Sequence, residues 1–207
     1  MNKKEIVLGV VGIVIIVVVA FFLANMIHDY NVNNINNVKT EDDRIMLDGE
    51  VVNFKTYKVD DSFFLNVPDT FIMLDEETLK SKYNYNSRPE LVFMSNDDLE
   101  HIFISTTNED MTDDGLETYL NNVIAGLTDM TVLDSGVYQE HDKTFAKLVI
   151  TNTNTYYNLR FFTIDNKLVT MEFNTPIGVY KDFEDVVNEV MDSICFNEED
   201  IKKYSSD

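Results

Sequence analysis

The strongest feature of the hydrophobic pattern is an apolar run near the N-terminus. Residues 6–24 read IVLGVVGIVIIVVVAFFLA, nineteen positions without a charged or strongly polar side chain. A helix of about 20 residues crosses the hydrocarbon core of a bilayer. We therefore predict one transmembrane helix over 6–24, preceded by a short tip of residues 1–5.

The flanks of this run predict its orientation. Lys3 and Lys4 precede it, whereas residues 25–38 contain no Lys or Arg. Because Lys and Arg are retained on the cytoplasmic side, we expect the tip in the cytoplasm and the rest of the chain outside the cell membrane. A cleaved signal peptide is the main alternative. The apolar core of such a peptide is usually about 7–15 residues, and no A-x-A cleavage site follows here.

Three further segments differ in their patterning. Residues 25–44 are rich in Asn, Asp and Thr without sustained periodicity, which is typical of a flexible stalk. Residues 45–197 carry strand-like and helix-like periods and are the predicted folded domain, outside the membrane. Residues 198–207 form a charged tail that is expected to fray. The chain is thus predicted to be a single-pass anchor with one globular domain.

The domain's pattern alternates between strand-like and helical periods. Apolar alternation predicts a hairpin over 50–58 and 63–67, turned by Asp60-Asp61-Ser62. Apolar stripes at helical spacing predict helices over 115–127 and 183–194. A shorter helix over 75–82 is capped by Asp75. The remaining strands are predicted over 91–94, 101–106, 131–134, 145–151, 156–164 and 167–174.

Three local signals refine this assignment. Asp165-Asn166 is a tight hairpin turn, and the run 156–164 is apolar on both faces, which favours a central strand covered on both sides. Asp114 and Glu117 form a capping box at the start of the long helix. The prediction is an α+β domain with an antiparallel sheet of six to eight strands and helices packed on both faces.

This pattern resembles the PsbP-like fold family. The segment 61–71, DSFFLNVPDTF, is similar to the family's opening strand that ends in a proline. The helix followed by an antiparallel meander is similar as well, and residues 180–196 resemble its closing helix and final Ser-x-x-Phe. The resemblance covers residues 50–196. It implies an αβα-layered, non-enzymatic module that often works as an accessory or binding protein, and it carries over no functional residue.

Composition narrows the range of partners. The formal net charge is −21, so the surface repels phosphate backbones and no nucleic-acid partner is expected. The chain has one cysteine, Cys195, which excludes an internal disulfide. We expect this thiol to be a small buried side chain on the apolar side of the last helix.

Metal and cofactor sites are not predicted. His28, His101 and His141 have no Cys or His at ligand spacing, which argues against zinc. His141, between Glu140 and Asp142, is interpreted as a solvated turn residue rather than a pH sensor or metal ligand. Weak binding of divalent cations at acidic turns such as 97–98 would not indicate a function.

One segment partly imitates a calcium loop. Asp110, Thr112, Asp114 and Gly115 fall at loop positions 1, 3, 5 and 6, but Asn121 stands where a bidentate Glu belongs. The preferred interpretation is a helix N-terminus that carries several acidic side chains.

Arg160 is the one candidate ligand residue. It lies in the predicted central strand among aromatic residues, and a covered arginine needs a partner carboxylate. The structural interpretation is an internal salt bridge or a side chain that reaches solvent. The functional one is an anchor for an anionic ligand in a cleft between sheet and helix.

No catalytic motif is present. The chain has no G-x-S-x-G and no phosphate-cradling glycine loop, so we do not expect an enzyme. The leading hypothesis is a membrane-anchored, non-catalytic interaction or accessory module with a protein partner in the cell envelope. The alternative is a small-ligand or ion-binding surface domain, and an unrecognised hydrolase comes third.

Overall fold

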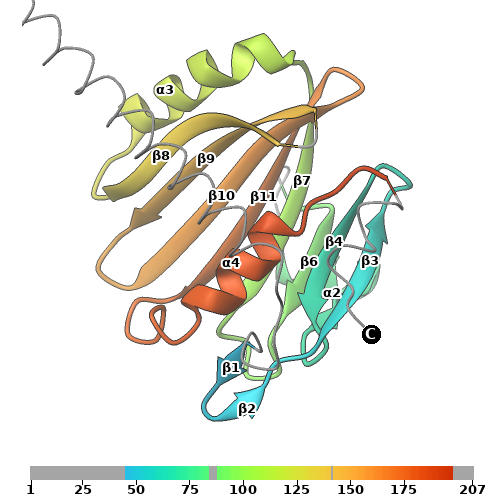
Figure 1. Ribbon diagram of the computed structural model, residues 1–207, viewed down its shortest axis with the longest axis vertical. Coiled ribbons are helices and arrows are strands. Elements are labelled where there is room, and N and C mark those ends of the chain that lie inside the picture. The colour runs from blue at the N-terminus through green and yellow to red at the C-terminus, as the bar shows by residue number, and fades with distance from the viewer. Residues whose placement is uncertain (1–44, 84–87, 141, 198–207) are drawn as a thin grey trace, which may run out of the picture. The chain divides into compact units, whose positions relative to one another are not determined.

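The computed structural model describes residues 45–83, 88–140 and 142–197 (Figure 1). The predicted transmembrane segment 6–24, the stalk and the tail lie outside the described residues, as do His28 and His141. Among the helices that are described, none is long and apolar enough to cross a membrane. The described domain begins at Ile45.

A seven-stranded sheet forms the centre of this domain, within the six to eight strands that were predicted. Its spatial order is β5-β6-β7-β11-β10-β9-β8, and every neighbouring pair is antiparallel. Strands β8 to β11 form the predicted meander, and β7 lies beside β11. The strands are β5 (Ile72–Met73), β6 (Leu91–Met94), β7 (His101–Asp110), β8 (Thr131–Glu140), β9 (Lys143–Thr151), β10 (Thr155–Ile164) and β11 (Lys167–Pro176).

Two small hairpins precede this sheet. The strands β3 (Phe54–Val59) and β4 (Phe63–Pro68) form the predicted hairpin, but as a separate two-stranded sheet. Its turn places Asp60 and Asp61 at φ 44° and 57°, a conformation that Asp adopts more readily than most side chains. A second pair, β1 (Met46–Leu47) and β2 (Glu50–Val51), differs from the prediction, because residues 50–51 were predicted as the start of the first hairpin strand but pair with β1 instead.

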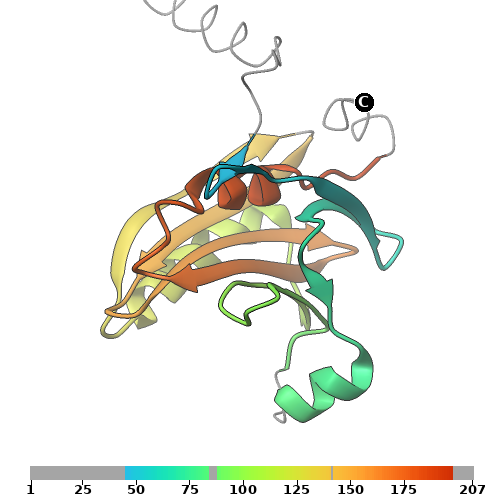
Figure 2. The same cartoon turned by 90° about the horizontal axis from the view of Figure 1, so that it is seen from below.

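Helices cover both faces of the main sheet, as predicted (Figure 2). The helix α4 (Glu184–Asp192) packs on one face, which we call the α4 face. The helices α2 (Glu76–Lys82) and α3 (Leu116–Gly126) pack on the other, the α3 face. The described domain is therefore an α+β fold of three layers.

The largest core lies on the α4 face. There the apolar side of α4 and the β3–β4 hairpin bury the inward side chains of the sheet. Phe162 of β10 is fully buried, with its ring centroid 5.2 Å from that of Phe63 in β4. Burying such a side chain contributes about 1.5–3 kcal/mol. The β3–β4 hairpin, although outside the main sheet, is thus held by packing.

Two smaller cores lie on the α3 face. Leu116 and Leu120 of α3 pack on Leu148 and Phe161 of the sheet. Under α2, Leu79 packs on Leu74 and Val92. The carboxylate of Asp75 accepts a hydrogen bond of 2.8 Å from the backbone N–H of Thr78, so the predicted cap of α2 is confirmed.

The start of α3 differs from the prediction. A 3₁₀ turn, Asp113–Gly115, precedes the helix, and Gly115 at the cap position makes no side-chain hydrogen bond. The predicted capping box of Asp114 and Glu117 is therefore wrong. Asp113 instead accepts a hydrogen bond from the hydroxyl of Thr163 in β10, which ties the turn to the sheet.

Cys195 is buried, with 2% of its surface exposed, and it forms no disulfide. It lies after α4 rather than on it, because its backbone pairs with Phe64 of β4 through hydrogen bonds of 2.7 and 3.2 Å. The chain thus leaves the helix in an extended conformation and adds a short bridge to the β3–β4 hairpin.

Candidate functional site

Arg160, the predicted ligand-anchor candidate, lies in the middle of β10. It faces the α4 side, directly opposite Lys147 of β9 and Met171 of β11. Only 2% of the residue is exposed. The prediction of a central strand covered on both faces is confirmed, and it explains why an arginine at this position is buried.

The guanidinium of Arg160 is held by protein groups. Its Nη2 lies 2.9 Å from Oδ1 of Asp192, the last residue of α4. Its Nη1 donates to Oδ1 of Asn158 at 2.5 Å and to the carbonyl of Leu159 at 3.3 Å. The ring of Tyr138 lies 6.0 Å away, within range of a cation–π contact. Among the described residues, Nε has no hydrogen-bond partner.

This arrangement matches the structural interpretation of Arg160. An arginine out of water needs a carboxylate, and Asp192 supplies one from a helix 32 residues later in the chain. The residue joins the centre of the sheet to α4. It is not among the residues that line the pocket described next.

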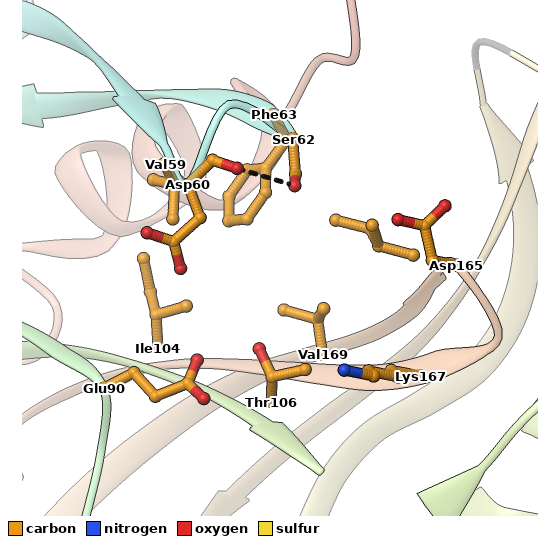
Figure 3. A pocket seen from close by; sticks show the side chains of 11 residues that line it. Val59, Asp60, Ser62, Phe63, Glu90, Ile104, Thr106, Asp165, Lys167 and Val169 are labelled. Atoms are coloured by element: carbon orange, nitrogen blue, oxygen red, sulfur yellow. Dashed lines mark hydrogen bonds between the residues drawn. The ribbon is translucent and has the colours of Figure 1, made fainter. Parts of the chain in front are cut away.

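A pocket of about 240 Å³ opens between the β3–β4 turn and the strands β7 and β11 (Figure 3). Part of its lining is apolar and belongs to the core: Phe63, Ile104 and Val169 are each 2% exposed. The hydroxyl of Ser62 donates to the carbonyl of Asp60 at 3.0 Å, which fixes the turn above the pocket. The result is a fixed hollow with an apolar base.

The rim of this pocket is charged. Asp60, Glu90 and Asp165 contribute three exposed carboxylates, and Lys167 contributes one ammonium. Figure 3 shows the carboxylates of Asp60 and Glu90 turned toward the same part of the pocket. The lining therefore has a formal charge of −2, which favours a cation over an anion.

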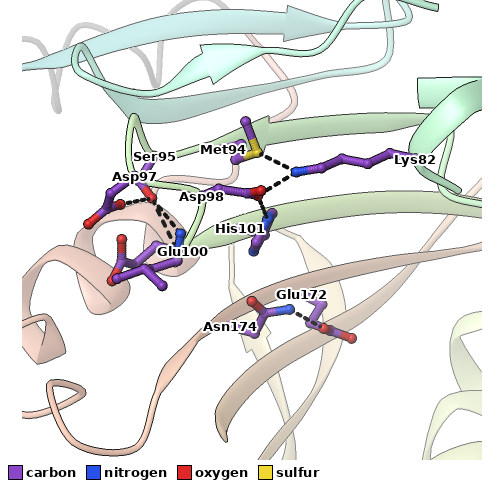
Figure 4. A network of polar contacts seen from close by, with 10 residues as sticks. Lys82, Met94, Ser95, Asp97, Asp98, Glu100, His101, Glu172 and Asn174 are labelled. Carbon is purple, nitrogen blue, oxygen red and sulfur yellow. Dashed lines mark hydrogen bonds and ion pairs between the residues drawn. The ribbon is translucent and has the colours of Figure 1, made fainter. Parts of the chain in front are cut away.

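A polar network lies at the start of β7, near α2 (Figure 4). Oδ1 of Asp98 is 2.5 Å from Nζ of Lys82 and 2.9 Å from Nε2 of His101. Both hydrogen bonds lower the pKa of Asp98, and the bond from Lys82 has the larger effect. The ring of His101 stacks on that of Phe103, with the ring centroids 5.4 Å apart, and faces away from Ile102 and Ile104. This network fixes the end of α2 to the sheet.

Two acids nearby have raised pKa values. Burial raises the pKa of Glu100, which is 3% exposed and lies 3.5 Å from the hydroxyl of Thr175. Burial also raises the pKa of Glu172, whose Oε1 accepts a 3.0 Å hydrogen bond from Asn174. Perturbed acids often mark active sites. These two lie on opposite faces of the sheet, because Glu172 is paired with Phe103 on the α3 face and Thr175 points to the α4 face.

The calcium-like segment takes a different form from a calcium loop. The 3₁₀ turn and α3 begin inside it, and its Asp113 is bonded to Thr163. Across the described parts of the chain, no three His, Cys, Asp or Glu side chains lie close enough to hold one metal ion.

The outer strand β8 is the most exposed part of the sheet. Its first seven residues are all exposed, and β9 is its one partner strand among the described residues. Three of them are apolar: Val132, Leu133 and Val137 are 39%, 50% and 40% exposed. The prediction placed a strand only over 131–134. It missed the rest because Ser135, Gly136 and Gln139 interrupt the apolar alternation.

Comparison with known proteins finds no matching protein-family model and no matching curated protein. Similar solved structures are found. The solution structure of cyanobacterial PsbP (CyanoP) from Synechocystis sp. PCC 6803 matches with a TM-score of 0.51 at 13% identity, over 72% of this chain and 95% of that one. LpqN of Mycobacterium tuberculosis, a protein involved in cell envelope biogenesis, matches with a TM-score of 0.50 at 11% identity, over 70% and 91%. The described domain therefore has the PsbP-like fold that the sequence pattern resembled.

Proposed function

We propose that this protein is a membrane-anchored, non-catalytic accessory domain that binds a protein partner in the cell envelope. Residues 6–24 are the anchor, residues 25–44 the stalk, and the domain from residue 45 to 197 faces away from the cytoplasm. The charge on Lys3 and Lys4 supports this orientation. LpqN, which shares the fold, is involved in cell envelope biogenesis, and this role is consistent with such a location.

The observation that carries the proposal is the exposure of β8. Val132, Leu133 and Val137 expose apolar surface along one outer strand, in a chain with a net charge of −21. Clustered apolar side chains on an otherwise charged surface are typical of interaction sites. In contrast, the acidic groups whose pKa values are shifted either form structural ion pairs or hydrogen bonds, or lie on opposite faces of the sheet. This arrangement favours binding over catalysis.

The experiment is cross-linking of the full-length protein in the membranes of its native cells, followed by identification of the attached proteins by mass spectrometry. The matched control keeps residues 1–44 and lacks residues 45–207. A stoichiometric partner that is captured by the full chain and lost from the control supports the proposal. Equal capture by both proteins, or no specific partner, contradicts it.

The pocket of Figure 3 favours a second candidate function, the binding of a small organic cation. Its apolar base of Ile104 and Val169 suits an aliphatic body, and its charge of −2 suits an ammonium group. A ligand that binds the folded state raises the melting temperature to a degree set by its concentration relative to Kd. We expect n-butylammonium, but not butyrate, to raise it.

The controls for this second function are single neutralising substitutions. Asp60→Asn and Glu90→Gln remove lining charges, whereas Asp69→Asn removes an exposed charge outside the pocket. The first two variants should lose the stabilisation by n-butylammonium and the third should keep it. Equal stabilisation of all three variants would assign the effect to the general acidity of the surface.

A further inference from the structure

We propose that β8 binds an extended segment of the partner, which joins the main sheet as an additional strand and places basic side chains beside the acids of β8. This inference rests on the proposed function, because it names the surface and the chemistry of the partner. The recognition would use the backbone groups of β8 for affinity and its side chains for selectivity.

The two edges of the main sheet differ in a way that marks β8. An edge strand presents unpaired N–H and C=O groups, and proteins usually protect such edges with short strands, prolines, lysines or covering helices. At one edge, β5 is two residues long and the chain turns into α2 soon after it. At the other edge, β8 has ten residues and contains no proline, lysine or arginine.

The backbone of β8 is regular over most of its length. One irregularity interrupts its pairing with β9 between Val132 and Asp134, and from Asp134 to Glu140 the register is continuous. Alternate residues of an edge strand direct their N–H and C=O outward, so this stretch offers about three or four donors and as many acceptors. An extended polypeptide is the ligand that can form hydrogen bonds with all of these outward N–H and C=O groups. The outer edge of β8 therefore defines its occupant as a polypeptide.

The side chains of β8 select the composition of that segment. Val137 is opposite Ala146 and lies on the α3 face, where it is 40% exposed. Asp134 and Glu140 lie on the α4 face, because β8 alternates and Asp134 is opposite Val149. The carboxylate of Asp134 pairs with Lys147 of β9 at 2.8 Å, but its side chain is still 58% exposed and can accept a further cation. A bound strand with apolar residues on one side and Lys or Arg on the other fits both faces. Gly136 leaves room between the acids, since a Cβ there would meet nothing within 4 Å.

A second copy of this chain fits β8 less well. Two copies bring together net charges of −21 each. An antiparallel pairing of two β8 strands centred on Val137 would also set Asp134 of each copy opposite Glu140 of the other. Like charges directly opposite on neighbouring strands destabilise the pairing. The charge of the chain thus favours a basic segment of another protein.

The test uses the full-length protein in detergent micelles and two synthetic peptides. The probe is acetyl-KVKVTVKVK-amide, which can form a strand. The control is acetyl-KPKPTPKPK-amide, which has the same charge but lacks the N–H groups that a strand needs. Hydrogen exchange is followed by residue. We expect the probe alone to slow the outward amides of β8 by about tenfold or more at saturation.

The matched protein variants add the same charge at two places. Val137→Lys replaces an apolar contact with the bound strand by a charge of the same sign as the probe, and Val179→Lys puts a lysine at a similarly exposed position outside the sheet. The first variant should weaken binding of the probe by about tenfold, or 1.4 kcal/mol, and the second should leave it unchanged. Both positions are on the surface, so neither substitution should prevent folding.

Each result decides a different point. Protection of β8 by both peptides, protection elsewhere on the acidic surface, or equal binding by the two variants would overturn the inference. So would slow exchange of β8 without peptide that depends on protein concentration, because it would identify a second copy as the occupant. If the cross-linking finds a partner whose capture does not change in Val137→Lys, the proposed function stands and β8 is not its site. If β8 binds the probe but no partner is found, the proposed function fails.

Discussion

Arg160 and Asp192 form an ion pair that connects the middle of the sheet to the end of its covering helix. Nη2 of Arg160 lies 2.9 Å from Oδ1 of Asp192, and the two side chains are 3% and 58% exposed. The pair is thus asymmetric, with a buried cation and a carboxylate that still contacts water. Although the carboxylate of Asp192 is more than half exposed, it stabilises the folded state, because it compensates the charge of a guanidinium that water does not reach.

Replacing Asp192 with Ala should therefore destabilise the domain. The substitution leaves Arg160 buried with two uncharged acceptors, and we expect a loss of about 1–3 kcal/mol in the free energy of unfolding. Urea denaturation followed by circular dichroism measures it. The double variant Arg160→Met/Asp192→Leu is the control, because it removes the buried charge as well. Its stability should lie closer to that of the wild type, and a double variant less stable than Asp192→Ala would contradict the argument.

The stability of the domain should fall as the pH rises from 5 toward neutrality. Burial raises the pKa values of Glu100 and Glu172 above the ordinary value of 4.5, so the folded state holds these protons more tightly than the unfolded state. The free energy of unfolding therefore decreases with pH between 4.5 and the raised pKa values, and it levels off above them. Below 3.8 the opposite holds, because Asp98 has a lowered pKa and its contribution is lost as it becomes protonated.

The midpoint of urea denaturation should thus be highest at about pH 4–5. Glu100→Gln should flatten the decrease toward neutral pH, and Asp98→Asn should flatten the decrease toward acid. A midpoint that rises steadily between about pH 5 and 7 in the wild type, or an unchanged slope in Glu100→Gln, would show that the desolvation of these acids does not govern the pH dependence.

Sequence patterns predicted the elements whose side chains enter a core and missed those decided by distant contacts. The stripe of α3 and the two-faced run of β10 were recognised because burial imposes a period on apolar residues. The second half of β8 carries no such period, since most of its side chains are exposed and its pairing with β9 fixes its backbone. The capping box failed for a related reason, because Asp113 bonds to Thr163, fifty residues away.

The candidate site was less predictable than the fold. The pattern identified Arg160 as a covered arginine that needs a carboxylate, but the chain has 37 acidic residues and no local rule selects Asp192. The pocket of Figure 3 combines the turn at Asp60 with Lys167 of β11, more than a hundred residues apart. Such a set exists only after the β3–β4 hairpin has packed on the sheet.

The turn between β10 and β11 should respond to glycine. Asp165 and Asn166 have φ values of 50° and 61°, the combination that a two-residue hairpin turn requires. Asn166→Gly should leave stability unchanged or raise it by up to about 0.5 kcal/mol, whereas Asn166→Ala should lower it by about 1 kcal/mol, because a Cβ without a compensating polar group is strained at this φ. Thermal denaturation of the two variants measures the difference, and an equal melting temperature would contradict the strain at this position.

Phe161 and Phe162 are neighbours in β10 whose side chains enter different cores. Phe161 packs on the α3 face, with its ring centroid 5.3 Å from that of Tyr119. Phe162 packs on the α4 face, with its centroid 5.2 Å from that of Phe63 and 5.7 Å from that of Phe196. Each residue therefore supports a different layer of the same sheet.

Replacing either phenylalanine with Ala should cost about 3–5 kcal/mol, because the cavity adds to the lost burial. The two variants should differ in where the structure loosens. In Phe161→Ala, native-state hydrogen exchange should accelerate first in α3. In Phe162→Ala, it should accelerate first in β4 and in the backbone bridge between Phe64 and Cys195. The pair controls for overall stability, because both variants lose the same side chain from adjacent positions. Identical exchange patterns would mean that the two cores unfold as one unit and that the β3–β4 hairpin does not depend on Phe162.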